Sequence, residues 1–223
     1  MSFTLLGLRT LARQRADMEN SSLVADAELT NYINASYAEL YDLLTARYED
    51  YFVKDPLTFS TSGTSIYPLP ADFYKLLGVD LQLDSSNWVS IRKWNFAERN
   101  KGNEIIPNIM NRCIRYRVMG QNLRLLPENN ADGTYRLWYI PRFAPLVADD
   151  GLLSGVLDFE EYIVLDSAIK MLVKEESDPS ALLSLKAQMG ERIVAMSANR
   201  DAGSPEVVGD VSYDDYDFLL PRG

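Results

Sequence analysis

Residues 26–48 carry the sequence DAELTNYINASYAELYDLLTARY, and this stretch decides the first half of the fold. Apolar, aromatic and small side chains recur at 3, 4, 7, 8, 11, 15 and 19 positions after Leu29. This spacing places them on one face of an α-helix. We therefore predict a helix of about 23 residues, with Asp26 as its N-cap and Glu28 in the first turn.

Three further helices are predicted around this one. A shorter helix over Thr4–Arg15 has an apolar stripe made by Leu5, Leu8, Leu11 and Ala12. Helical periodicity returns at Asp158, and the pair Asp178-Pro179 is typical of a cap followed by a helix start. In the last helix a coiled-coil-like seam is expected, formed by Leu182, Leu185, Met189, Ile193 and Met196.

From Pro56 the pattern changes to short strands, which we predict at 57–61, 64–69, 78–83 and 88–92, with one helical turn at 70–76. The clearest strand signal lies in residues 112–140. There Ile114, Tyr116 and Val118 alternate with Cys113, Arg115 and Arg117, and turns at 119–122 and 129–133 lead into strands at 123–127 and 134–140. This stretch predicts an antiparallel meander with one arginine-bearing face.

Helices at both ends and strands between them predict an α+β fold. The expected architecture is a discontinuous helical bundle with an inserted antiparallel β module and an extended C-terminal tail. The corresponding parts are the N-terminal helices of the bundle at 1–50, the β module at 51–150, the C-terminal helices at 151–202 and the tail at 203–223.

The composition argues against most enzymes. Histidine is absent and Cys113 is the single cysteine, which excludes catalytic triads with histidine and zinc sites of the cysteine–histidine type. No phosphate-binding loop or nucleophile motif occurs, and the mean hydropathy of −0.17 accompanies no apolar run of about 18 residues. We therefore expect no catalytic residue, cofactor, metal site or membrane span. A hydrolase that uses carboxylates alone, such as the adjacent acids at 149–150, 160–161 and 175–176, remains a remote alternative.

Charge is unevenly distributed along the chain, whose formal net charge is −10. Residues 91–142 carry 10 basic and 4 acidic groups, whereas the tail from 201 carries 1 basic and 6 acidic groups. This asymmetry favours charge-complementary contacts with a partner or between copies of the chain. The residues expected on the basic face are Arg115, Arg117, Arg124 and Arg136. Three interpretations stay open for this face: a solvated surface, contact with an acidic partner, and nucleic-acid binding with Trp138 nearby.

Several segments resemble a known family. They are LARQRADMENSSLVADAELTNYINASYAELYDLL at 11–44, FSTSGTSIYPLPADFYKLLGVDL at 59–81, FAERN at 96–100 and KMLVKEESDPSALLSLKAQMGERIVAMSANRDAG at 170–203. In this order they look like the head–tail adaptor proteins of tailed bacteriophages. The helix–strand–helix layout also resembles the podovirus adaptors called tail tubular protein A.

The resemblance implies a non-enzymatic virion protein of the head–tail neck, assembled in the host bacterial cytoplasm. It implies a ring of twelve copies that joins the portal protein to the tail nozzle or another tail component. DNA would pass through the ring without sequence-specific binding, because an acidic lumen repels phosphate. It also implies portal docking by the C-terminal tail, which here contains Tyr213, Tyr216, Phe218, Leu219 and Leu220.

Overall fold

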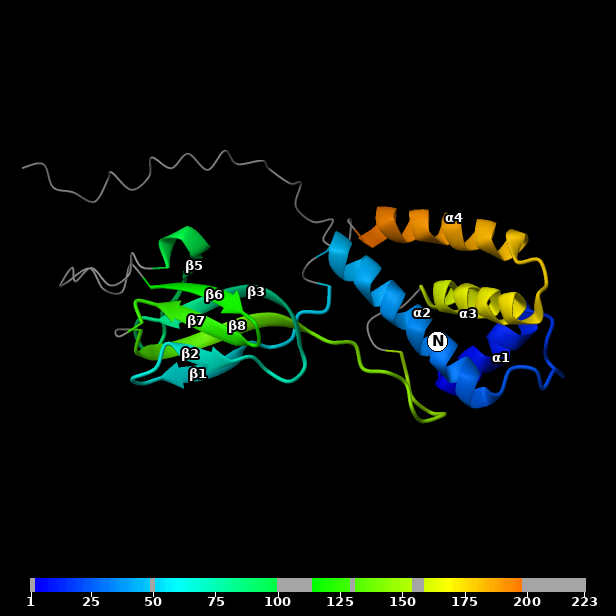
Figure 1. Cartoon of the computed structure of the whole chain (residues 1–223), viewed down its shortest axis with the longest axis horizontal. Helices are drawn as coiled ribbons and strands as arrows, with labels where there is room; N and C mark the ends of the chain where they lie inside the picture. Colours follow the sequence, from blue (N-terminus) through cyan, green and yellow to red (C-terminus); the bar gives the residue numbers. More distant parts are fainter. Residues whose placement is uncertain (1–2, 49–50, 100–113, 129–130, 154–158, 198–223) are drawn as a thin grey trace, which may run out of the picture.

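The computed structural model describes residues 3–48, 51–99, 114–128, 131–153 and 159–197. It contains four α-helices, α1 (Leu5–Arg15), α2 (Asp26–Arg47), α3 (Glu160–Glu175) and α4 (Ser180–Ser197), in these described residues. The strands are β1 (Leu57–Thr61), β2 (Ile66–Pro68), β3 (Phe73–Gln82), β4 (Trp88–Ser90), β5 (Arg92–Lys93), β6 (Arg115–Met119), β7 (Asn122–Leu126) and β8 (Gly133–Pro141), with the short 3-10 helix η1 (Phe96–Glu98) after β5. The helices gather at one end of an elongated molecule and the strands at the other (Figure 1).

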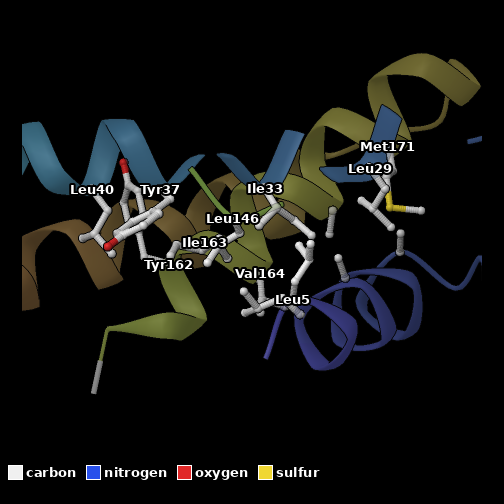
Figure 2. Close-up of a cluster of buried hydrophobic side chains, with 14 of the residues drawn as sticks. Leu5, Leu29, Ile33, Tyr37, Leu40, Leu146, Tyr162, Ile163, Val164 and Met171 are labelled. Carbon is white, nitrogen blue, oxygen red and sulfur yellow. The ribbon is translucent and has the colours of Figure 1, made fainter. Parts of the chain in front are cut away.

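The helices from both ends of the chain share one buried cluster. Leu5, Leu29, Ile33, Ile163 and Met171 are all fully buried in it. Figure 2 shows these side chains pointing toward one another from α1, α2 and α3, with Leu146 entering from the segment before α3. Burial of each large apolar side chain contributes about 1.5–3 kcal/mol, so this cluster is the main stabilising feature of the helical part.

The helix starts confirm one predicted cap and correct another. At α4, Asp178 Oδ1 accepts a hydrogen bond of 2.9 Å from the backbone N–H of Ser180, as a cap residue should. At α2 the N-cap is Ala25, not Asp26, and no side chain caps it. Asp26 is already helical, and its Oδ1 accepts a 2.8 Å hydrogen bond from Arg13 Nη2 instead.

The strands form two four-stranded sheets, in the orders β1-β8-β3-β4 and β2-β7-β6-β5. A second buried cluster includes Phe59 of β1, Tyr116 of β6 and the fully buried Leu123, Tyr135 and Leu137. Phe59 stacks on Tyr135 with ring centroids 5.4 Å apart. The alternation of residue types along the strands therefore reflects side chains of both sheets that point inward into this cluster.

Three predictions about the β module were wrong in detail. Strands β6 and β7 pair as expected, but β8 leaves them and lies between β1 and β3 in the other sheet, so there is no three-stranded meander. Strands β5 and β6 run parallel, so the β module is not wholly antiparallel. Residues 70–76 hold only a turn closed by Phe73 N–H to Pro70 O, after which β3 begins at Phe73, because pairing with β8 outweighs the local helical preference.

Hydrogen bonds join the helical part to the strands. Tyr41 on α2 donates from its hydroxyl to the backbone oxygen of Pro141 at 2.6 Å, and Tyr74 on β3 donates to Asp42 Oδ1 at 2.8 Å. The pKa of Tyr41 is raised, chiefly by burial. The α+β class is therefore confirmed. The finer expectation of a bundle with an extended tail stays a prediction, because residues 198–223 lie outside the described part.

None of the helices in the described residues is long and apolar enough to cross a membrane.

Candidate interaction surfaces

The four arginines predicted to share a face lie on two sheets. Arg117 of β6 is the direct cross-strand neighbour of Arg124 on β7, and Arg115 lies two residues along β6 on the same side. Arg136 belongs to β8, whose neighbours are β1 and β3. The expected cluster is therefore a group of three, with Arg136 separated from it by the change of sheet at β8.

Two of these arginines already cover tryptophan rings of their own chain. The Arg117 guanidinium lies 5.4 Å from the centroid of Trp94, and its Nη1 donates to the Trp94 backbone oxygen at 3.1 Å. Arg136 lies 3.7 Å from the centroid of Trp88. Each such contact contributes roughly 0.5–1 kcal/mol at an exposed site. These stacks give both arginines a structural role within the β module.

Trp138, which the sequence placed beside Arg136, also has an internal partner. Its indole Nε1 donates a 2.6 Å hydrogen bond to Asp80 Oδ2, while Ser90 Oγ donates to Asp80 Oδ1 at 2.7 Å. Asp80 is the cross-strand neighbour of Arg136. The outer face of this sheet is thus a network of polar and aromatic side chains, held together across β3, β4 and β8.

A buried ionic cluster between the helices was not predicted as a site. Asp166 on α3 is 5% exposed, and its carboxylate accepts hydrogen bonds from Ser36 Oγ at 2.6 Å, Lys170 Nζ at 2.5 Å and Lys186 Nζ at 2.8 Å. Lys186 lies on α4 and also contacts Glu39 Oε1 on α2 at 2.9 Å. One carboxylate therefore ties three helices together, which specifies how α4 is placed on α2 and α3.

The electrostatics of this cluster favour the charged forms. Burial by itself would raise the pKa of Asp166, but the hydrogen bonds from Lys170, Lys186 and Ser36 outweigh it, so this pKa is lowered. Burial would lower the pKa of Lys186, yet Asp166 and Glu39 raise it overall. The pKa of Tyr162, whose hydroxyl donates to Glu39, is raised to about 12 by burial and by that hydrogen bond. Asp166 and Lys186 therefore stay charged across the neutral range.

One signal for the cluster was present in the sequence. Asp166 falls on the same predicted helix face as Tyr162, Ile163 and Ile169, where a charged residue is out of place unless it is paired. Lys170 follows it by four residues, at the spacing that allows an ion pair on a helix. Lys186, however, comes from another helix, and no local pattern predicts that contact.

The predicted seam of α4 packs only in part. Ile193 is fully buried and Leu182 and Met189 are half-buried, whereas Leu185 and Met196 are 43% and 51% exposed. The helix is held on one side by these apolar residues and by Lys186. Within this chain the predicted seam is therefore filled only in part, where α4 packs against α2 and α3.

Between α2 and α4 lies an open groove of about 620 Å³. Apolar side chains dominate its lining, and its edge carries Arg47 from α2 and Glu191 from α4. The apolar lining comes from Leu43, Tyr162, Leu183, Ala187 and Val194, with Gly190 between them. The side chains that line the groove form no catalytic arrangement, and their apolar character suits contact with another apolar surface.

The adjacent carboxylates do not form an acid–base site. Asp149 is paired with Arg9 at 2.8 Å, and Glu161 is paired with Arg15. Glu160, at the start of α3, is 7% exposed. In the described residues no group of three or more acidic, cysteine or histidine side chains could hold a metal ion.

The tail residues predicted to dock on a portal, namely Tyr213, Tyr216, Phe218, Leu219 and Leu220, lie outside the described residues. Their role stays a prediction. Cys113 also lies outside the described residues.

Comparison with known proteins identifies the family. No curated protein matches the chain. A family model described as SU10 adaptor protein matches residues 3–210, which include every described helix and strand. The match agrees with the phage head–tail adaptor expected from the segments at 11–44, 59–81 and 170–203, while the closer likeness to tail tubular protein A stays untested. The chain therefore belongs to the SU10 adaptor protein family and is a structural component of a phage virion.

Proposed function

We propose that this chain is a head–tail adaptor whose copies form a ring that joins the portal to the tail around the DNA channel. The observation that carries the proposal is the family match over residues 3–210. The composition supports it, since a net charge of −10 lets DNA slide past a surface that does not retain phosphate. Twelve copies, assembly in the host cytoplasm and a role in DNA ejection belong to the same proposal.

The decisive experiment is the mass of the assembly by light scattering, first with the chain alone and then with purified portal. We expect a species of fixed stoichiometry in the presence of portal. A chain that stays a monomer beside assembled portal would overturn the proposal. Portal incubated with bovine serum albumin at equal concentration controls for non-specific association.

Portal docking is assigned in this proposal to the apolar residues of the tail, namely Tyr213, Tyr216, Phe218, Leu219 and Leu220. Deletion of residues 204–223 should abolish association with portal. A variant with serine at these five positions should behave like the deletion, whereas asparagine at Asp214, Asp215 and Asp217 controls for charge. If the deletion leaves portal association unchanged, the tail is not the docking element.

The three arginines on β6 and β7 are proposed to contact a neighbouring copy or the next tail component. The alternative is that Arg115, Arg117 and Arg124, with Arg136, bind nucleic acid. Filter binding of duplex DNA at 50 and 200 mM salt separates the two, because phosphate contacts give steep salt dependence. Strong retention at low salt that Arg115→Gln reduces would favour nucleic-acid binding. No retention would favour the protein contact.

A further inference from the structure

An exposed apolar edge lies where the start of α1 meets the segment that precedes α3. Leu6, Val147 and Leu152 are 55%, 82% and 55% exposed. Backbone hydrogen bonds from Leu6 N–H to Asp149 O and from Leu5 N–H to Gly151 O bring the two segments together, and Thr4 forms an antiparallel bridge with Leu152. We call Leu6, Val147 and Leu152 the apolar edge.

The apolar edge and the α2–α4 groove lie on opposite sides of the helical part. Asn34 of α2 holds the segment of the edge by two hydrogen bonds with the backbone of Leu146, at 2.8 and 2.9 Å. Leu43, which lines the groove, comes nine residues later on the same helix. At about 100° per residue, Asn34 and Leu43 point in directions about 180° apart. Figure 1 agrees, since the segment after β8 passes on the side of the helices away from α4.

Charged residues accompany the apolar side chains of both surfaces. Asp149, which pairs with Arg9, and the exposed Asp150 lie beside the edge, whereas the exposed Arg47 lines the groove. No ion pair of Arg47 or Asp150 occurs within the part of the chain that the structure describes. Lys186 and Glu191 also line the groove, so its lining carries charges of both signs. A contact between Asp150 of one copy and Arg47 of the next would favour a defined pairing.

We propose that the apolar edge of one copy docks in the α2–α4 groove of the next copy. This inference rests on the proposed function, because it names the surfaces through which the ring would form. Two different surfaces on opposite sides of one molecule give a head-to-tail contact, and such contacts close into rings when the rotation per copy allows it.

The test is cysteine cross-linking of Val147→Cys and Ala187→Cys in a Cys113→Ser background, which removes the single native cysteine. The double variant, assembled with portal and oxidised, should give a ladder of covalent multimers on a non-reducing gel. A mixture of the two single variants should give dimers only, because each contact then joins one edge to one groove. Each single variant alone should give no cross-link.

Substitutions provide a second readout that does not depend on disulfide geometry. Val147→Asp and Leu183→Asp should each raise the concentration needed for assembly at least tenfold without changing the circular dichroism of the free chain. Val173→Asp is the matched control, because Val173 on α3 is 59% exposed but belongs to neither surface. It should assemble like the unmodified chain.

The outcomes separate this inference from the proposed function. Rings of normal mass with no ladder and with normal assembly of both Asp variants would overturn the inference and leave the adaptor function intact. Failure of the unmodified chain to associate with portal would overturn the function itself.

Discussion

Replacing Asp166 with asparagine tests whether the buried ionic cluster determines the packing of α4. The substitution keeps the size of the side chain but removes the charge that faces Lys170 and Lys186. Removal of one partner from a buried ion pair costs about 3–5 kcal/mol. We expect about 3 kcal/mol, near the low end, because Lys186 keeps its contact with Glu39 and the Lys170 side chain is 31% exposed.

Urea unfolding followed by circular dichroism at 222 nm is the appropriate assay, because the helical part dominates that signal. With a slope of about 2 kcal/mol per molar urea, a loss of 3 kcal/mol moves the midpoint down by about 1.5 M. The control is Lys174→Met, which removes an exposed ion pair with Glu28 on the same face of the protein and should have little effect. A shift of less than about 0.5 M for Asp166→Asn would refute the reasoning.

A triple variant identifies the source of the cost. Asp166→Leu combined with Lys170→Met and Lys186→Met replaces the buried carboxylate and its two lysines with apolar side chains, and it leaves Glu39, whose side chain is 49% exposed. Such replacements are often neutral or stabilising, because no buried charge then remains to be desolvated. We expect the triple variant to recover most of the stability lost in Asp166→Asn. If it is less stable than the single variant, the cost lies in packing rather than in unpaired lysines.

The difference in unfolding free energy between the unmodified chain and Asp166→Asn should depend on pH, and the direction of the Asp166 pKa shift determines how. The pKa of Asp166 in the folded protein is lowered from its usual 3.8, because the lysine and serine hydrogen bonds outweigh burial. The carboxylate therefore contributes stability above pH 3.8, and that contribution is lost as the pH falls through the lower folded pKa. The difference in unfolding free energy between the unmodified chain and Asp166→Asn should be constant from pH 5 to 8 and narrow below about pH 4.

Three further outcomes are expected. Tyr135→Phe should lower the free energy of unfolding, measured in urea, by about 1 kcal/mol, because it removes the 2.7 Å hydrogen bond to Ala131 O. Tyr135→Ala should lower it by about 3–5 kcal/mol, because it opens a cavity. Absorbance at 295 nm should show Tyr162 ionising near pH 12, and ionisation at a lower pH would contradict its burial. The free energy of unfolding should fall from pH 10 upward, since the raised pKa favours the folded state only while the tyrosine is protonated. Arg136→Gln should expose Trp88 and red-shift its fluorescence, and an unchanged spectrum would contradict the stacking.

Patterns in the amino-acid sequence were enough to predict those features that depend on residues close together in the chain. The 3.6-residue recurrence after Leu29 is a property of one helix, and the structure contains that helix from Asp26 to Arg47. The same is true of the alternation at Ile114, Tyr116 and Val118 and of the cap at Asp178. Absence of histidine and of catalytic motifs, together with the segments at 11–44, 59–81 and 170–203, was enough to indicate a structural phage protein.

Tertiary structure alone decided which of these elements meet. Strand β8 lies between β1 and β3, although its chain neighbour is β7, and its inward side chains Tyr135 and Leu137 are fully buried there. Arg136, which belongs to β8, therefore does not lie on the same sheet as the other three arginines. Asp166 and Lys186 are 20 residues apart on different helices, and only the packing of α4 brings their charges within 2.8 Å. The apolar edge and the groove likewise combine residues from distant segments, since side chains far apart along the chain become one surface only when the core has placed their helices.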